Sequence, residues 1–116
     1  MGLELKKLGD TLIVRVHGEF DLGAAGYCRK EIDKKVRTEG IKDIIFDLEG
    51  VTFIDSSGLG LILGRYRIVK ENGGRVVISN AEVRIVKILD LSGINRLIPV
   101  YPSTSQALRY LARGVV

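Results

Sequence analysis

Three polar residues that could carry chemistry stand together at positions 55–57, as Asp55, Ser56 and Ser57. All three favour the N-cap of a helix, where a side-chain oxygen accepts a hydrogen bond from a backbone N–H group. Capping explains one of them. A phosphoryl group on a serine at a helix N-terminus would meet free backbone N–H groups and the positive end of the helix dipole. A phosphoryl group there would add about −1.5 to −2 charge without unfolding the chain, and would therefore switch the surface and not the fold.

Three glycines, Gly58, Gly60 and Gly64, follow the serines in a segment whose apolar residues have helical spacing. The apolar residues predict a helix with one buried stripe, formed by Leu59, Ile62, Leu63, Tyr66 and Val69. Glycine in a helix interior costs on the order of 1 kcal/mol relative to alanine. Three glycines in such a helix therefore predict a functional reason for their presence.

Gly60 and Gly64 lie on one side of the predicted helix, away from the buried stripe. Together with the flanking Leu61 and Ile68 they form a smooth, partly apolar strip, called the glycine strip below. If the strip is exposed, the backbone or a helix of another protein can approach it closely, and such surface usually marks an interface. The alternative is close packing of the strip against a neighbouring element of the same domain.

The glycine segment also has the form G-x-G-x-x-x-G, which follows a predicted strand and opens a helix, as in dinucleotide-binding sites. Such a site requires an acidic residue at the end of the next strand to bind the ribose, and that strand ends in Ser79-Asn80-Ala81. The glycines also extend a full turn into the helix, whereas a phosphate needs them only in the loop. Nucleotide binding by Gly58 to Gly64 is therefore the weaker hypothesis.

Few residue types that support catalysis are present. His17 is the single histidine and lies at the end of a β-like segment, where a structural role is favoured over that of a catalytic base. Cys28 is the single cysteine, so the chain has no usual zinc ligand set and cannot form an internal disulfide. The motifs G-x-S-x-G and G-x-x-x-x-G-K-[ST] are absent. We therefore expect a protein that is not an enzyme and that uses no cofactor or metal.

Length and charge limit the number of domains and the kinds of partner that we expect. The 116 residues, 46% of them hydrophobic, suffice for one domain over residues 1–116. The longest apolar runs fall far short of the roughly 20 residues that cross a bilayer, and no signal peptide is recognisable, so we expect a cytoplasmic protein that does not bind a membrane. The net charge of +4 comes from basic residues interspersed with acidic ones and without interleaved aromatic residues, so direct binding to nucleic acid is not expected.

Hydrophobic patterning predicts an α/β fold. β-like segments over residues 3–7 and 11–17 flank the turn signal Gly9-Asp10 and predict a hairpin, followed by a loop at residues 18–21. Further strands are predicted over residues 43–48, 75–79 and 97–100, and helices over residues 24–39, 56–71, 83–89 and 103–112. Because strands and helices alternate after the hairpin, we expect a mixed, mostly parallel sheet with about four helices packed on it.

The segment FIDSSGLGLILGRY, residues 53–66, closely resembles the phosphorylation-site segment of anti-sigma factor antagonists in the STAS-domain family. The likeness covers nearly the whole chain, because residues 18–21 resemble the G-E-L-D loop of the family, residues 43–53 its central strand, and residues 91–93 its M-S-G segment. The loop departs from the family in three residues. Phe20 replaces a leucine, and Leu22 and Gly23 stand where two histidines often follow the aspartate.

The resemblance implies a STAS fold and a regulatory function. The unphosphorylated protein would bind an anti-sigma factor that is also a serine kinase and release the sigma factor held by it, which we expect to be the sporulation factor sigma-F. Phosphorylation of Ser56 would inactivate the protein, and a PP2C-type phosphatase would reverse this. The free protein would be monomeric. Its partner-binding surface would comprise Asp21, Asp55, Ser56, Ser57, Gly60, Leu61, Gly64 and Ile68.

Three questions stay open at this point. A STAS module of another system, such as a stressosome-like assembly, the general stress response or a regulated transporter, would share the fold and the serine. The basic charge also departs from typical acidic members of the family, and leaves the partner open. Of the adjacent serines, Ser56 is the expected phosphate acceptor because its hydroxyl can point outward ahead of the regular helix, whereas Ser57 is better placed to cap the helix or to turn toward the domain.

Overall fold

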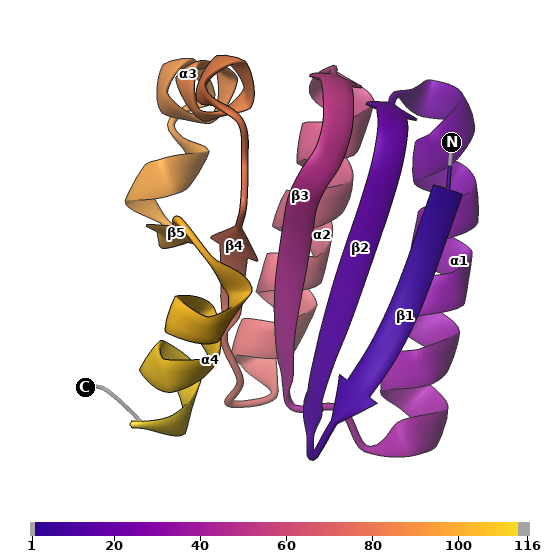
Figure 1. Ribbon diagram of the computed structural model, residues 1–116. Coiled ribbons are helices and arrows are strands. Elements are labelled where there is room, and N and C mark those ends of the chain that lie inside the picture. Colours follow the sequence, from indigo (N-terminus) through magenta and orange to yellow (C-terminus); the bar gives the residue numbers. More distant parts are fainter. Residues whose placement is uncertain (1, 114–116) are drawn as a thin grey trace.

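The computed structural model describes residues 2–113 of the chain, which form a five-stranded sheet in the order β1-β2-β3-β4-β5. The strands are β1 (Gly2–Leu8), β2 (Thr11–Phe20), β3 (Asp43–Ile54), β4 (Val76–Ser79) and β5 (Val100–Tyr101). The helices are α1 (Leu22–Glu39), α2 (Ser56–Glu71), α3 (Val83–Ser92) and α4 (Thr104–Ala112), with a 3₁₀ turn at Ile94–Arg96. β1 pairs antiparallel with β2, and the remaining strands pair in parallel (Figure 1). The predicted mostly parallel sheet opened by a hairpin is confirmed.

Helices cover both faces of the sheet. Alternate strand residues point to opposite sides, and apolar residues on both sides pack against helices. Leu12 and Val14 belong to the larger core, which also contains residues of α1, α2 and α3. Ile13 and Ile45 face the other way and pack with α4 in a smaller core. Figure 1 shows α1 and α2 side by side behind the strands. This places the N-termini of α1 and α2 at one edge of the sheet, where β2 and β3 end.

β2 and β3 are longer than the sequence predicts. The predicted ends lie at residues 17 and 48, whereas the two strands continue together to Phe20 and Ile54. Their register shifts between Arg15 and His17 and again between Gly18 and Glu19, and Gly18 has a left-handed φ of 86°. A β-bulge changes the register without ending the ladder. The turn-forming residues 18–20 therefore belong to an irregular strand, and only Asp21 of the predicted loop lies beyond it.

The last strand lies further along the chain than predicted. The pattern over residues 97–100 predicts a strand, but β5 contains only Val100 and Tyr101. Gly93 ends α3 with a φ of 83°, the 3₁₀ turn follows, and Ile98 is fully buried ahead of β5. Short apolar runs do not distinguish a buried turn from a strand, which explains the error.

His17 and Cys28 both pack against other parts of the domain. His17 lies on β2, with Nε2 3.5 Å from Oε1 of Glu4, and its ring is packed against Gly50. Cys28 is fully buried on the inner side of α1, and this burial raises the pKa of its thiol. Within residues 2–113, no helix combines the length and the apolar character that a membrane span requires.

Candidate functional site

Two aspartates stand next to each other where the central strands end. β2 and β3 are parallel neighbours with Phe20 opposite Ile54, so Asp21 and Asp55 follow adjacent strand ends. The two aspartates have nearly the same backbone conformation, with φ −114° and ψ −170° at Asp21 and φ −114° and ψ −172° at Asp55. Parallel pairing thus brings together two predicted site residues that lie far apart in the sequence.

Each aspartate caps the helix that it precedes. Asp21 Oδ1 accepts a hydrogen bond from the Ala24 backbone N–H at 3.2 Å. Asp55 Oδ1 accepts two, from the N–H groups of Ser57 at 2.8 Å and Gly58 at 3.2 Å. These contacts hold α1 and α2 at a defined orientation and place both carboxylates at the positive ends of the helix dipoles.

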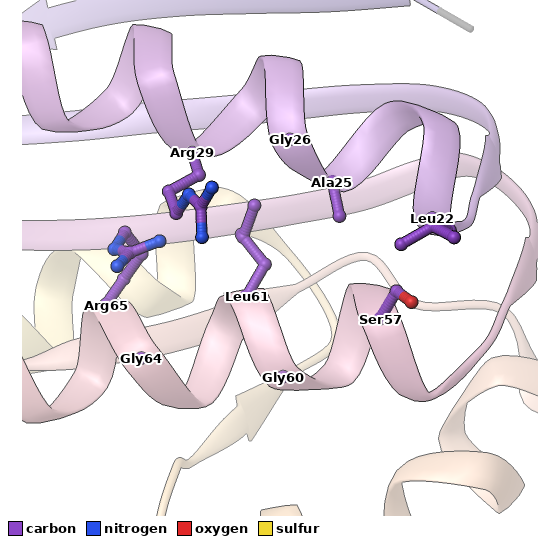
Figure 2. A pocket seen from close by; sticks show the side chains of 9 residues that line it. All are labelled: Leu22, Ala25, Gly26, Arg29, Ser57, Gly60, Leu61, Gly64 and Arg65. Carbon is purple, nitrogen blue, oxygen red and sulfur yellow. The ribbon is translucent and has the colours of Figure 1, made fainter.

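The two serines after Asp55 differ in exposure. Ser56 is the first residue of α2 and is exposed, whereas Ser57 is partly buried and lies beside the space between α1 and α2 (Figure 2). Of the two alternative roles predicted for Ser57, capping is not observed, because Asp55 caps the helix. The other expectation for Ser57, a turn toward the domain, agrees with its position. The exposure of Ser56 favours it as the phosphate acceptor, which remains a prediction.

The first amides of α2 are already paired, which corrects the expectation that a phosphate would find them free. The N–H groups of Ser57 and Gly58 bind the Asp55 carboxylate, and the Leu59 N–H binds the Asp55 carbonyl oxygen at 3.0 Å. A phosphoryl group on Ser56 would therefore stand beside a carboxylate that occupies the helix end. It would have to displace the cap or remain in solvent.

The glycines of α2 have two different roles. A Cβ atom at Gly58 would lie 2.4 Å from the carbonyl oxygen of Phe20, so only glycine lets α2 begin this close to the end of β2. A Cβ atom at Gly60 or Gly64 would meet no neighbouring atom within 4 Å. Packing within the domain therefore explains Gly58, but it does not explain Gly60 and Gly64, which leave an open surface.

The glycine strip is open at three of its four residues. Gly60 is exposed, Gly64 is partly exposed, and Ile68 is 38% exposed. Leu61 is only 6% exposed, so its expected exposure is wrong. It lies between α1 and α2 in Figure 2, because α1 covers this side of α2. The predicted buried stripe is confirmed, since its members all lie in or against the core: Leu59, Ile62, Leu63, Tyr66 and Val69.

A groove of about 400 Å³ runs between α1 and α2 (Figure 2). Ser57, Gly60 and Gly64 line its α2 side, and Leu61 lies between the two helices. Sequence reasoning missed the α1 side of the groove and one further residue of α2. The missed lining residues are Leu22, Ala25, Gly26, Arg29 and Arg65. The available signal was the run of small residues at positions 23–26, which follows Asp21 as the glycines of α2 follow Asp55.

Two large apolar side chains are exposed near the aspartates, and both were missed from the sequence. Leu22 directly follows Asp21 and is 75% exposed, and Phe53 precedes Asp55 on β3 and is 48% exposed. Leu22 also lines the groove, and contiguous exposed apolar surface is typical of protein contact sites. In the described part of the chain, no group of three or more His, Cys, Asp or Glu residues could hold a metal ion. The arrangement thus places the exposed Ser56 at the same strand ends as two carboxylates and two exposed apolar side chains.

The chain is similar to a known domain family and to characterised proteins. The STAS domain model matches residues 2–107. An anti-sigma F factor antagonist of Paenibacillus polymyxa is 32% identical over 109 residues, covering 94% of this chain and 93% of the relative. An anti-sigma-B factor antagonist of Bacillus subtilis is 26% identical over 100 residues, covering 86% of this chain and 90% of the relative.

Solved structures of the anti-sigma factor antagonist SpoIIAA are also similar. The unphosphorylated form has a TM-score of 0.84 and 28% identity, with 99% of both chains covered. The phosphorylated form, from Bacillus, has a TM-score of 0.75 and 27% identity, with 94% of this chain and 98% of that chain covered. The family match over nearly the whole chain, the fold and the relatives agree, and the chain belongs to the STAS domain family.

Proposed function

We propose that the protein is an anti-sigma factor antagonist that acts by partner switching. The unphosphorylated form binds an anti-sigma factor that is also a serine kinase, of the SpoIIAB type, and so releases a sigma factor. The kinase phosphorylates Ser56 and then releases the phosphorylated protein. A PP2C-type phosphatase of the SpoIIE type regenerates the binding form. The Paenibacillus relative, an anti-sigma F factor antagonist, supports sigma-F as the released factor.

The observation that carries this proposal is that Ser56 is exposed and directly precedes the α2 residues Ser57, Gly60 and Gly64, which line the open groove. Ser56 follows the Asp55 cap and lies three residues after Phe53, which is also exposed. A phosphoryl group there adds negative charge where Asp21 and Asp55 already stand, so it changes the surface without needing to change the fold. This is what a reversible protein–protein switch requires.

The general stress response is the second candidate system. The Bacillus subtilis relative is an anti-sigma-B factor antagonist, and its likeness covers 86% of this chain. The surface around Ser56 would work in the same way with either sigma factor. We favour sigma-F because two anti-sigma F factor antagonists are 32% and 35% identical to this chain, whereas the anti-sigma-B factor antagonists of Bacillus subtilis and Staphylococcus aureus are 26% and 31% identical.

Binding of a nucleotide by the glycine segment is not favoured. Gly58 is pressed against Phe20, and the Ser57 and Gly58 amides that would hold a phosphate are bound by Asp55. A carboxylate at this position repels a phosphate. We expect calorimetry of the purified protein with ATP, GTP or NAD to show no micromolar affinity, and a micromolar dissociation constant for any of them would restore the nucleotide hypothesis.

The function is tested by displacement of a labelled sigma factor from its complex with the cognate anti-sigma factor, followed by fluorescence anisotropy. Wild-type protein is expected to release the sigma factor, and failure to do so overturns the proposal. Gly64→Arg is expected to require at least about tenfold more protein to release the sigma factor, because an arginine side chain would fill the groove. Its stability should be equal or slightly higher, since no atom lies within 4 Å of the Cβ position and arginine is the better helix former.

Gly64→Ala is the matched control, because it adds only a methyl group at the same position. We expect it to keep most of the release activity. Thermal unfolding of both variants separates binding from folding. Full activity of Gly64→Arg would place the interface elsewhere, and a large loss of stability would contradict the open surface at Gly64.

A further inference from the structure

We infer that the groove between α1 and α2 binds a carboxylate side chain of the protein partner, held between Arg29 and Arg65. This inference rests on the proposed function, because it specifies the chemistry of the segment that the anti-sigma factor presents to this surface. It assigns a role to two arginines that the Ser56 switch does not use.

Arg65 is an incompletely paired cation at the groove. Its side chain is only 9% exposed, and Nε lies 3.1 Å from Asp33 Oδ1 in an ion pair. The geometry of this contact does not make a hydrogen bond, and among residues 2–113 Nε of Arg65 is the one buried side-chain nitrogen or oxygen without a hydrogen-bond partner. Buried polar groups in folded proteins are nearly always hydrogen-bonded. Because this Nε atom is buried beside Asp33, an acceptor in the groove would bind the terminal Nη groups of Arg65, which lines the groove.

Arg29 faces Arg65 from the α1 side of the groove (Figure 2). It is exposed, and the ion pairs found within residues 2–113 all involve other residues. Asp33 balances one of the two guanidinium groups, so this part of the groove keeps a net positive charge. The positive charge and the unused N–H donors favour an anionic acceptor, and guanidinium groups bind carboxylates with two parallel hydrogen bonds.

The rest of the groove favours a carboxylate on a side chain over a free inorganic anion. Leu61 and Ala25 present apolar surface, and Cβ atoms at Gly26, Gly60 and Gly64 would meet no atom within 4 Å. A phosphate or sulfate ion would place some of its oxygens against this apolar surface, which is unfavourable. A glutamate or aspartate of a protein has two oxygens for the arginines and an apolar stem for Leu61. The glycines also let the backbone of the partner approach closely.

The test compares Arg29→Glu with Lys30→Glu, two exposed charge reversals on α1. Arg29 lines the groove and Lys30 does not. The probe is the purified cognate anti-sigma factor, and its affinity is measured by calorimetry at low and high salt. Arg29→Glu is expected to weaken binding at least about tenfold and to reduce its salt dependence. Lys30→Glu is expected to change the affinity less than about threefold, and Arg29→Lys to keep part of it. Circular dichroism verifies that the variants are folded.

The outcomes separate this inference from the proposed function. Normal binding by Arg29→Glu, together with lost binding by Ser56→Asp, overturns the groove assignment and leaves the proposed function standing. No binding by the wild type overturns both. If replacing an acidic residue of the anti-sigma factor with arginine restores its affinity for the Arg29→Glu variant, the assignment is supported. Tight binding of inorganic phosphate in NMR titrations, with shifts at Gly60 and Gly64 and no effect of Arg29→Glu on the partner, assigns the groove to a small anion and overturns it.

Discussion

Phosphorylation of Ser56 is expected to weaken binding of the anti-sigma factor by two or more orders of magnitude while the domain stays folded. A phosphoryl group on the exposed hydroxyl would stand beside Asp55 and Asp21, and burying this dianion with two carboxylates in an interface costs several kcal/mol unless it is fully paired. About 1.4 kcal/mol corresponds to each tenfold loss in affinity. The free domain avoids this cost because the phosphate can remain in solvent, and any competition with the Asp55 cap should reduce stability by only about 1 kcal/mol.

Three variants test this switch with the cognate kinase and ATP. Ser56→Ala is expected to bind the kinase and accept no phosphate, Ser56→Asp to bind poorly, and Ser57→Ala to remain a substrate. Mass spectrometry locates the phosphate, and calorimetry with the ADP-loaded kinase measures the affinity. Phosphate on Ser57, or a phosphorylated protein that binds as tightly as the unmodified one, would contradict the mechanism.

Gly58→Ala is expected to destabilise the protein by about 3 kcal/mol, the upper part of the range for overpacked sites. The added Cβ atom would lie 2.4 Å from the Phe20 carbonyl oxygen, 2.9 Å from Ile54 Cγ1 and 3.1 Å from Phe20 Cγ. A backbone carbonyl cannot move aside as a flexible side chain does. Relief of the clash would require α2 to shift away from the end of β2, and this would disturb the Asp55 cap and the position of Ser56.

Gly60→Ala is the matched control, two residues further along the same helix. Because its Cβ position is open, the substitution should raise stability by up to about 1 kcal/mol through helix propensity alone. Urea unfolding followed by circular dichroism measures both variants. Equal stability of Gly58→Ala and wild type would show that α2 does not begin against β2 as closely as described.

Local sequence patterns account for much of the fold. The Gly9-Asp10 turn, the helix stop at Gly40 and the apolar periodicity of α2 each depend on residues close together in the chain, and each prediction is confirmed. The strand ends were less predictable. Gly18 is a residue typical of turns, but β2 continues past it to Phe20 because it pairs with β3. Pairing between distant segments outweighs local preference there.

The sequence by itself therefore determined the α/β class, the Asp55-Ser56-Ser57 helix start and the hypothesis of a phosphorylation switch, because capping, periodicity and motif are local properties. Only the tertiary structure decided which glycine is packed and which are open. A Cβ atom at Gly58 of α2 would clash with Phe20 of β2, whereas a Cβ atom at Gly60 or Gly64 would meet no atom within 4 Å. The tertiary structure also buried Leu61 under α1 and brought Arg29 toward Arg65. These facts depend on how α1 and α2 lie on the sheet, which no local pattern specifies.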